Sequence, residues 1–169
     1  GFNHHGVIHN DMKSEDSMQQ WFINNSNPKN FKGNISEAMV DADVFIGVSA
    51  PNVLTESDVA SMAKGSIVFA LANPDPEIDP AIARKYAAVV ATGRSDQPNQ
   101  INNVLAFPGI FRGLLDANAH KISDQMLVAA AEAIADCVSP DQLNTSFIVP
   151  SVFDPNVVKA VAAAVKKSV

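Results

Sequence analysis

Two sets of asparagine side chains are spaced so that they could bind an anionic ligand while remaining neutral themselves. Asn73 opens the turn-forming run N-P-D-P-E, and Asn102 and Asn103 stand together ahead of the apolar run V-L-A-F-P-G. A side-chain amide can donate to a carboxylate or hydroxyl oxygen without adding charge to the site. These asparagines are therefore candidates for binding a ligand.

Each asparagine also has a structural interpretation that the residues alone leave open. Asparagine tolerates the backbone conformations of turns, so Asn73 could simply begin a loop. Asn102 or Asn103 could cap the N-terminus of the helix that the apolar run begins.

Other reactive side chains give weaker signals. Arg94 could pair with a carboxylate, although an arginine at a strand end is more often only solvated. Asp75, Glu77 and Asp79 alternate with prolines and lack a histidine, so we expect loop acids and a helix cap rather than metal ligands. The single cysteine, Cys137, lies in an alanine-rich helical pattern and is expected to act as a small buried hydrophobic residue.

Three continuous apolar runs indicate the elements that position these residues. The runs are Val44–Val48, Ile67–Leu71 and Ala88–Ala91. Apolar runs without alternation suit strands that are covered on both faces, as in a parallel sheet. Asn73 follows the second strand, so it would lie at the carboxyl edge, where open α/β sheets bind their ligands. The chain is predicted to have an α/β fold.

Helix-start patterns separate and follow the strands. Asn34 with Glu37, and Thr55 with Asp58, have the spacing of capping boxes. Asp79 followed by Pro80 begins another predicted helix. The remaining predictions are a loop with one short helix over residues 11–32, an early helix over 35–42, later helices over 110–119, 123–138 and from 154 onward, and a short strand over 147–149.

The overall composition excludes several classes of protein. The chain has 169 residues, 47% hydrophobic and 18% charged, which is typical of one soluble globular domain. A net charge of −6, with no basic cluster beyond Lys166 and Lys167, argues against nucleic-acid binding. No apolar run approaches the roughly 20 residues of a membrane span, and no signal peptide opens the chain. We therefore expect a cytoplasmic protein that does not bind membranes.

A glycine-rich phosphate loop is missing from this sequence. No G-x-G-x-x-G motif occurs, although such a motif usually lies between the first strand and helix of a dinucleotide-binding fold. The opening G-F-N-H-H-G-V-I (residues 1–8) has the pattern of a strand exit. We expect a fragment that begins near the end of a second strand.

Three motifs in one order carry a resemblance to a known family. N-P-D-P-E, N-N-V-L-A-F-P-G and P-S-V-F-D-P resemble the cofactor-domain half of malic enzymes, particularly the shorter bacterial type, from about Gly6 onward. The resemblance implies a partial, parallel-sheet Rossmann-like NAD(P)-binding domain with C-terminal helices. Residues 1–169 would then form that domain without its glycine-rich loop and without the N-terminal substrate and metal domain.

The same resemblance implies roles for individual residues. Asn73 would hold malate near the nicotinamide and border the cofactor, and at least one of Asn102 and Asn103 would contact substrate. The loop at Val48, Ser49 and Ala50 would run along the ribose side of the cofactor.

The first residues bear on the choice between NAD and NADP. Asn3 and His4, with His5, stand where the family has an acidic residue and its neighbours before Gly6. An acid there would bind the ribose 2′-hydroxyl of NAD and repel the 2′-phosphate of NADP. Its replacement by Asn3, beside two histidines that could donate to a phosphate, favours NADP over NAD.

The implied activity is oxidation of malate by hydride transfer to NAD or NADP, then loss of carbon dioxide to give pyruvate, with Mg²⁺ or Mn²⁺. The family's acid, base and metal ligands precede the matched segment, and Tyr86 lies in a crossover helix. We therefore assign this chain no catalytic or metal-binding residue, expect no activity from it alone, and expect a homodimer or larger homo-oligomer at full length. Two alternatives remain: the cofactor half-domain of another NAD(P)-dependent α/β dehydrogenase, or a non-catalytic nucleotide-binding or interaction module.

Overall fold

A parallel sheet of three strands is the centre of one part of the molecule. The computed structural model describes all 169 residues. Strands β3 (Val44–Gly47), β4 (Ile67–Ala70) and β5 (Val89–Thr92) lie in the order β3-β4-β5. Neighbouring strands are parallel and their ends are aligned, with Val44 opposite Ile67 and Ile67 opposite Val89. The three predicted strands and the α/β fold class are confirmed.

Short helices precede and connect these strands, and their caps are those that the sequence predicts. Helices α2 (Ile35–Met39) and α3 (Glu56–Ala60) begin at complete capping boxes, and Asp79 caps α4 (Pro80–Ala83). Helix α2 ends before the predicted residue 42, because the chain leaves the helical conformation at Val40 and Asp41 has a φ of +56°.

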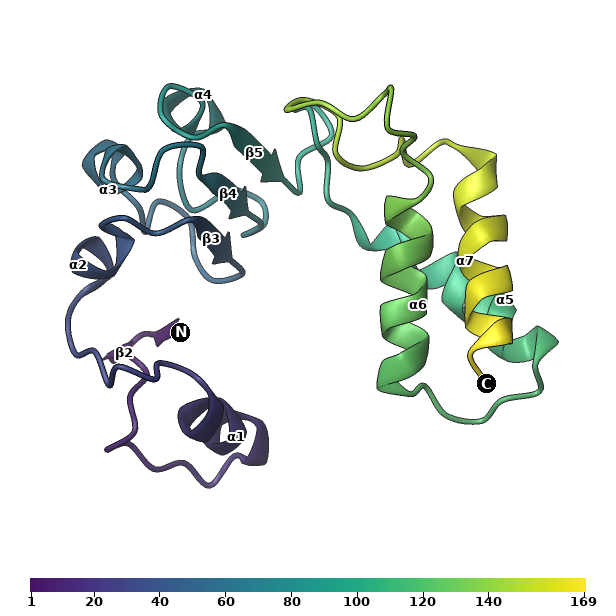
Figure 1. Ribbon diagram of the computed structural model, residues 1–169, viewed down its shortest axis with the longest axis horizontal. Coiled ribbons are helices and arrows are strands. Elements are labelled where there is room, and N and C mark those ends of the chain that lie inside the picture. The colour runs from purple at the N-terminus through teal and green to yellow at the C-terminus, as the bar shows by residue number, and fades with distance from the viewer.

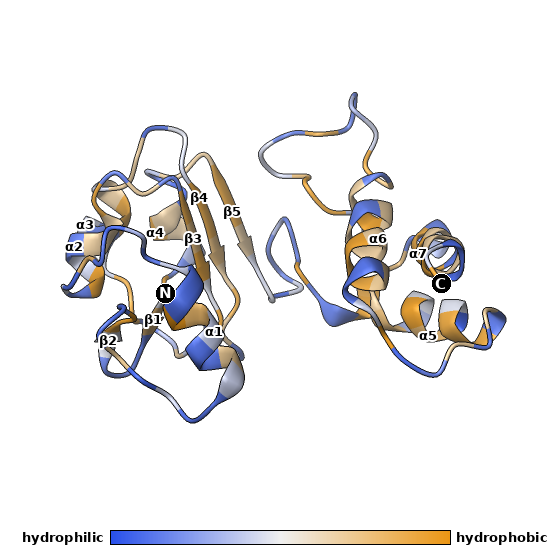
Figure 2. Ribbon diagram, turned by 60° about the horizontal axis from the view of Figure 1, so that its bottom comes forward, coloured by the Kyte–Doolittle hydropathy of each residue, from blue (hydrophilic) through white to orange (hydrophobic).

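A hydrophobic cluster joins this sheet to its helices. Figure 2 shows the strands as predominantly hydrophobic ribbons beside α2, α3 and α4. The buried members of the cluster are Met39, Leu54, Val59, Met62, Val68, Ala70, Ile78, Ala83, Ala87 and Val90. Burying such side chains is the main favourable term in the stability of this part of the fold.

The first eight residues form a hairpin instead of the predicted strand exit. Strand β1 (Phe2–Asn3) pairs antiparallel with β2 (Gly6–Val7), and the chain reverses between them. Gly6 has a φ of +113°, which a residue with a Cβ atom rarely adopts. The residues with the pattern of a strand exit therefore pair with each other across a local turn.

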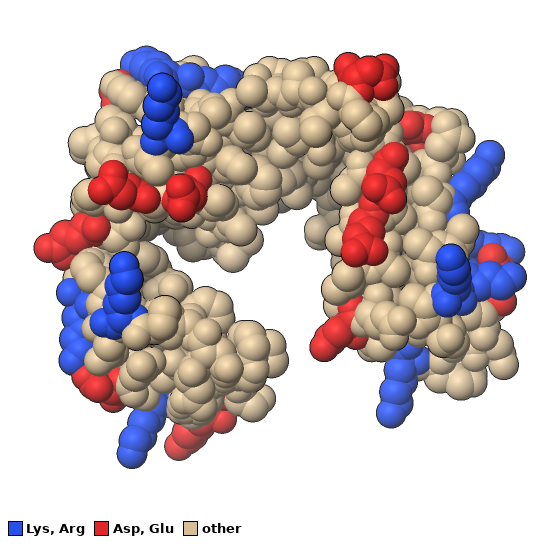
Figure 3. Space-filling view, viewed as in Figure 1, with Lys and Arg blue, Asp and Glu red and all other residues tan.

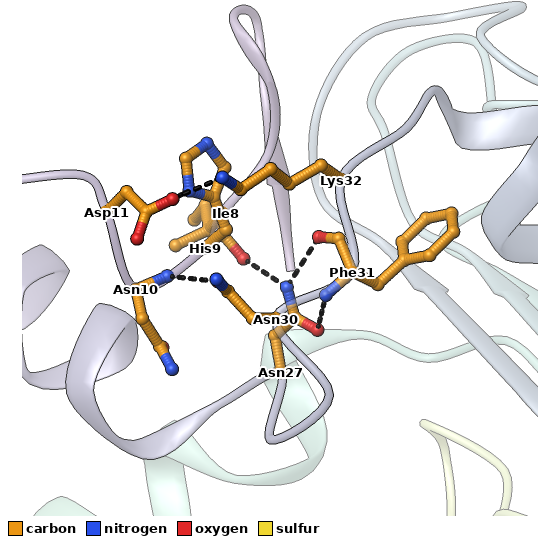
Figure 4. Close-up of polar contacts among 8 residues, drawn as sticks. All are labelled: Ile8, His9, Asn10, Asp11, Asn27, Asn30, Phe31 and Lys32. Carbon is orange, nitrogen blue, oxygen red and sulfur yellow. Dashed lines mark hydrogen bonds and ion pairs between the residues drawn. The ribbon is translucent and has the colours of Figure 1, made fainter.

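Helix α1 (Ser17–Asn25) follows, and a polar network ties the segment after it to the hairpin (Figure 4). The side-chain amide of Asn27 donates to the carbonyl oxygens of Ile8 (3.0 Å) and Phe31 (2.8 Å). Lys32 forms an ion pair with Asp11. The predicted loop with one short helix over residues 11–32 is confirmed, and its ends are fixed by these contacts.

Three longer helices form a separate helical unit beyond β5 (Figure 1). They are α5 (Phe107–Asp116), α6 (Asp124–Ala135) and α7 (Pro155–Lys167), preceded by a 3₁₀ turn, η1 (Asn103–Leu105). Their buried residues form a second hydrophobic cluster, comprising Leu105, Ile110, Met126, Ala130, Val157, Val161 and Val165. The predicted C-terminal helices are confirmed.

Two glycines allow α5 and α7 to pack closely. A Cβ atom on Gly109 would lie 2.5 Å from Cβ of Val161, and one on Gly113 would lie 2.7 Å from Cβ of Val165. Their four-residue spacing places both glycines on one face of α5. These glycines therefore serve helix packing rather than phosphate binding.

The buried side chain of Asn99 connects the sheet to the segment between α6 and α7. Its Nδ2 donates to the carbonyl oxygens of Val90 (3.1 Å) and Thr145 (2.8 Å), and its Oδ1 accepts the N–H of Ile148 (3.0 Å). The predicted strand over residues 147–149 is wrong, because only an isolated bridge between Asn144 and Phe147 forms there. The backbone of residues 147–149 is held partly by the amide side chain of Asn99 instead of a neighbouring strand.

The molecule is hollowed between the N-terminal segment and the helical unit, as the space-filling view shows (Figure 3). The surface beside this hollow is largely uncharged in that view. No helix of the chain has both the length and the apolar character needed to cross a membrane.

Candidate functional site

The candidate residues follow strand ends that are level with one another. Gly47 at the end of β3 pairs with Ala70 at the end of β4, and Ala70 pairs with Thr92 at the end of β5. We call this side of the sheet the carboxyl edge. The loops that leave it begin at Val48, Leu71 and Gly93.

The loop after β3 presents small, exposed residues. Val48 is 77% exposed, and Ser49 and Ala50 are exposed as well. The backbone N–H of Ser49 donates to Oε1 of Glu77 at 2.9 Å, and the Ser49 hydroxyl lies 3.4 Å from the same oxygen. The backbone of this loop is thus anchored to a buried carboxyl group, while its residues are exposed to solvent. An extended ligand could therefore run along the loop.

The loop after β4 leaves the Asn73 side chain free. Asn73 is exposed, and its amide forms no hydrogen bond within the chain. The preceding residue, Ala72, is buried, and its N–H donates to Oε2 of Glu77 at 3.0 Å. A fixed backbone with an unengaged amide suits ligand binding. The chain also bends at Asn73, so the residue serves the local backbone as well.

The segment after β5 returns to the carboxyl edge before the helical unit begins. Gln100 forms a parallel bridge with Thr92, and the N–H of Ile101 donates to the Thr92 carbonyl oxygen at 2.8 Å. This return places Asn102 and Asn103 immediately beyond the end of β5. The segment therefore adds a third loop to the same edge.

The amides of this segment have different environments. Asn102 caps η1, because its Oδ1 accepts the N–H of Val104 at 3.0 Å. Asn103 is exposed and its side chain forms no hydrogen bond within the chain. Asn99 is 5% exposed and fully engaged in structural contacts. Of the three, Asn103 has the amide that is most available to a ligand.

The N-terminal candidates lie in the hairpin turn. Oδ1 of Asn3 accepts the N–H of His5 at 2.9 Å, and the exposed rings of His4 and His5 have centroids 3.8 Å apart. Phe2, beside Asn3, lines the same apolar groove as Val48 and Ser49. The start of the hairpin and the loop after β3 therefore border one groove.

Arg94 and Tyr86 each bond to a nearby carboxylate. The Arg94 guanidinium forms two hydrogen bonds with Asp96, at 2.8 and 2.7 Å. These bonds raise the pKa of Arg94 and lower the pKa of Asp96. Tyr86 precedes β5, at the opposite edge, and donates to Glu56 at 2.8 Å, which raises the pKa of the phenol. Both side chains therefore already have a partner within the chain.

The sequence predicts the environments of some of the acidic residues and of the cysteine, but not that of Glu77. Asp75 is exposed and Asp79 is a helix cap, as predicted, but Glu77 is completely buried rather than a solvated loop acid. Cys137 is half-buried against the helical cluster, and burial raises the pKa of its thiol. No three histidine, cysteine, aspartate or glutamate side chains group closely enough to hold a metal ion, so these residues do not fit a metal site.

Glu77 is the residue of this edge whose position the sequence analysis missed. The available signal was Gly47, which ends the apolar strand V-F-I-G where a side chain would normally be packed. A glycine inside or at the end of a strand often marks a place where another group approaches closely. Here that group is the carboxyl of Glu77.

A parallel sheet with loops of small residues and free amides at its carboxyl edge defines the class: a partial, Rossmann-like nucleotide-binding domain. Within that class the chain belongs to the malic enzyme family. Residues 2–169 match the family described as malic enzyme, NAD binding domain.

Known malic enzymes are similar over nearly the whole chain. The NAD-dependent malic enzyme of Geobacillus stearothermophilus is 54% identical over 98% of this chain, and the NADP-dependent malic enzyme of Rhizobium meliloti is 41% identical over 99%. The crystal structure of malic enzyme from Pyrococcus horikoshii superposes with a TM-score of 0.88 at 44% identity over 95% of the chain. The chain spans only 34%, 25% and 38% of these three proteins, respectively.

Proposed function

We propose that this chain is the carboxyl-terminal part of the NAD(P)-binding domain of a malic enzyme, which oxidises malate and releases pyruvate and carbon dioxide. The observation that carries the proposal is that two unengaged amides, Asn73 and Asn103, follow neighbouring strand ends beside the open loop of Val48, Ser49 and Ala50. Family membership supports the same activity.

In this proposal the chain positions the reactants. Asn73 and Asn103 donate amide N–H groups to the carboxylate and hydroxyl oxygens of malate, which holds the carbon that loses hydride toward the cofactor. The loop from Val48 to Ala50 borders the cofactor on its ribose side. When bound, the nicotinamide supplies the hydride acceptor.

The remaining catalytic groups lie outside this chain in the proposal. The chain has no group of metal ligands, and Tyr86 lies at the wrong edge of the sheet. We therefore assign the acid, the base and the ligands of Mg²⁺ or Mn²⁺ to the rest of a full-length enzyme. The isolated chain should bind cofactor weakly and catalyse nothing.

We extend the proposal to NADP as the preferred cofactor. Asn3 stands where an acidic residue would repel the 2′-phosphate of NADP, and His4 and His5 beside it are exposed donors. Related malic enzymes include both NAD-dependent and NADP-dependent forms, and the ratio of kcat/KM values with the two cofactors tests this preference.

The proposal also covers location and assembly. We place the full-length enzyme in the cytoplasm. We propose a homodimer or larger homo-oligomer for the full-length protein, to be tested by measuring its mass in solution.

Turnover measurements test the proposed function. A full-length protein containing this chain should reduce NADP or NAD with malate and a divalent cation, and release pyruvate. The isolated 169-residue chain should show no turnover under the same conditions. If the full-length protein does not consume malate but reduces the cofactor with another hydroxy acid, it is a different α/β dehydrogenase. If it binds nucleotide without any turnover, it is a binding module.

A further inference from the structure

We propose that Glu77 is a positioning residue, which fixes the cofactor-side loop after β3 relative to the malate-binding Asn73 after β4. This inference rests on the proposed function for the meaning of the two loops. It concerns a buried carboxyl group that takes no part in the binding roles described above.

The two carboxyl oxygens of Glu77 serve two different loops. Oε1 accepts the backbone N–H of Ser49 at 2.9 Å, with the Ser49 hydroxyl at 3.4 Å. Oε2 accepts the backbone N–H of Ala72 at 3.0 Å. Ala72 directly precedes Asn73, so one side chain connects the loop of one strand to the binding residue of the next.

The backbone beside Glu77 extends the same connection. The Glu77 carbonyl oxygen accepts the N–H of Leu54 at 3.0 Å, and the Pro76 carbonyl oxygen accepts the N–H of Asn52 at 3.1 Å. The stretch from Pro76 to Glu77 therefore holds the loop after β3 at both its beginning and its end.

The site around this carboxyl group is built to receive it. Glu77 is 0% exposed, and a Cβ atom on Gly47 would lie 2.4 Å from Cδ of Glu77. The absence of a side chain at the end of β3 thus provides the space for the carboxyl group. No lysine, arginine or histidine forms an ion pair with Glu77.

The chemistry of a carboxyl group explains why glutamate occupies this position. Burying a carboxyl without a cation costs free energy, which the hydrogen bonds from two backbone N–H groups offset. A carboxylate offers two acceptor oxygens at fixed separation. A glutamine has only one acceptor oxygen, so it would satisfy one N–H and turn its own NH₂ toward the other.

The connection matters because binding geometry affects rate. Misplacing reactants by about 1 Å can lower rates about 100-fold. Without the carboxyl link, Ser49 and Ala72 would lose their shared acceptor, and only backbone hydrogen bonds would connect the two loops. Glu77 therefore acts through Ser49 and Asn73 and touches neither reactant.

The test is a double-mutant cycle in the full-length enzyme. The variants are Glu77→Gln, Asn73→Ala and the double variant, with Asp75→Asn as control, because Asp75 is an exposed carboxyl in the same loop. Three quantities are measured for each: kcat/KM for malate, the dissociation constant of reduced cofactor by fluorescence titration without malate, and the melting temperature. If Glu77→Gln does not fold, Glu77→Asp takes its place, because its shorter side chain retains the charge but cannot reach both N–H groups.

We expect Glu77→Gln to lower kcat/KM for malate about tenfold or more and to weaken cofactor binding in protein that remains folded. In the Asn73→Ala background the further loss should be much smaller, because the two residues act through one loop. Asp75→Asn should match wild type. Fully additive losses, or a lower melting temperature with wild-type kinetics and cofactor affinity, would overturn the proposal.

Failure of the proposed malic enzyme function would give a different result from failure of the positioning role of Glu77. In that case wild-type protein would not turn over malate at all, and the cofactor titration would still compare Glu77→Gln with Asp75→Asn. Equal cofactor affinity in those two variants would then overturn the positioning role by itself.

Discussion

Gly47 and Glu77 fit together at the carboxyl edge of the sheet: the position that a Cβ atom of Gly47 would take lies 2.4 Å from Cδ and 2.5 Å from Oε1 of Glu77. The two residues are 30 positions apart in the chain. A missing side chain at the end of β3 and a buried carboxyl after β4 are thus one structural feature.

We expect Gly47→Ala to destabilise the protein by about 1–3 kcal/mol, because the added methyl group must displace the Glu77 carboxyl from a packed site. Urea denaturation of the full-length protein measures this loss. Gly93→Ala is the matched control at the end of β5, since a Cβ atom there meets only the Ile101 carbonyl oxygen at 3.9 Å. Equal stability of the two variants would show that the space at Gly47 is not needed.

We expect Asn99→Gly to lower the free energy of unfolding by about 1–3 kcal/mol, because it leaves the buried carbonyl of Val90 and the partly buried backbone groups of Thr145 and Ile148 without their partner. Glycine accepts the φ of +58° at this position, so the variant removes the side chain without straining the backbone. Asn118→Gly is the control, because Asn118 has a φ of +52° and is exposed. Similar unfolding curves for both variants would contradict the structural role of Asn99.

The carboxyl of Asp58 should make stability depend on pH in the acid range. Burial raises its pKa, but hydrogen bonds from the Ser36 side chain and from the N–H and hydroxyl of Thr55 outweigh burial, so the pKa lies below the ordinary value of 3.8. A lowered pKa in the folded state means that this stabilisation is present above 3.8 and is lost as pH falls through the folded-state value.

Asp58→Asn should therefore lower stability at neutral pH, by about 0.5–2 kcal/mol for a weakened helix cap, and reduce the further loss below pH 3.8. Urea denaturation at neutral pH and below this value gives both quantities. Asp75→Asn, which changes an exposed carboxyl, should follow the wild-type curve. If Asp58→Asn loses as much stability below pH 3.8 as the wild type does, another group controls the pH dependence.

We expect Asn3→Asp to shift cofactor preference from NADP toward NAD by about fivefold or more in the ratio of kcat/KM values, because the new charge repels a 2′-phosphate. Aspartate keeps the oxygen that accepts the His5 N–H, so the turn should persist. Asn118→Asp adds the same charge in the helical unit and should not change the ratio. A wild-type enzyme that prefers NAD would contradict the assignment of Asn3.

The predictable parts of this fold are those that local sequence determines. The caps at Asn34 and Thr55 each involve residues three positions apart, and the apolar strands around Val44, Ile67 and Val90 carry their own pattern. The location of Asn73 at the carboxyl edge follows from its place after the second of these strands.

The parts that could not be predicted depend on partners far away in the chain. The buried carboxyl of Glu77 fits into the space beside Gly47 and accepts from Ser49, which lie 30 and 28 positions earlier. Asn99 stands close to Asn102 and Asn103 in the sequence, but its partners Thr145 and Ile148 are 46 and 49 positions away. Those same contacts account for part of the backbone bonding where a strand at 147–149 was predicted.

The most direct test of the proposed function compares Asn103→Ala with Asn102→Ala in the full-length enzyme. Losing one hydrogen bond to a charged substrate should cost Asn103→Ala roughly 10- to 150-fold in kcat/KM for malate, with little change in melting temperature. Asn102→Ala should chiefly destabilise the protein, by about 1 kcal/mol, because it removes the cap of η1. Normal malate kinetics in Asn103→Ala would contradict the account of this site.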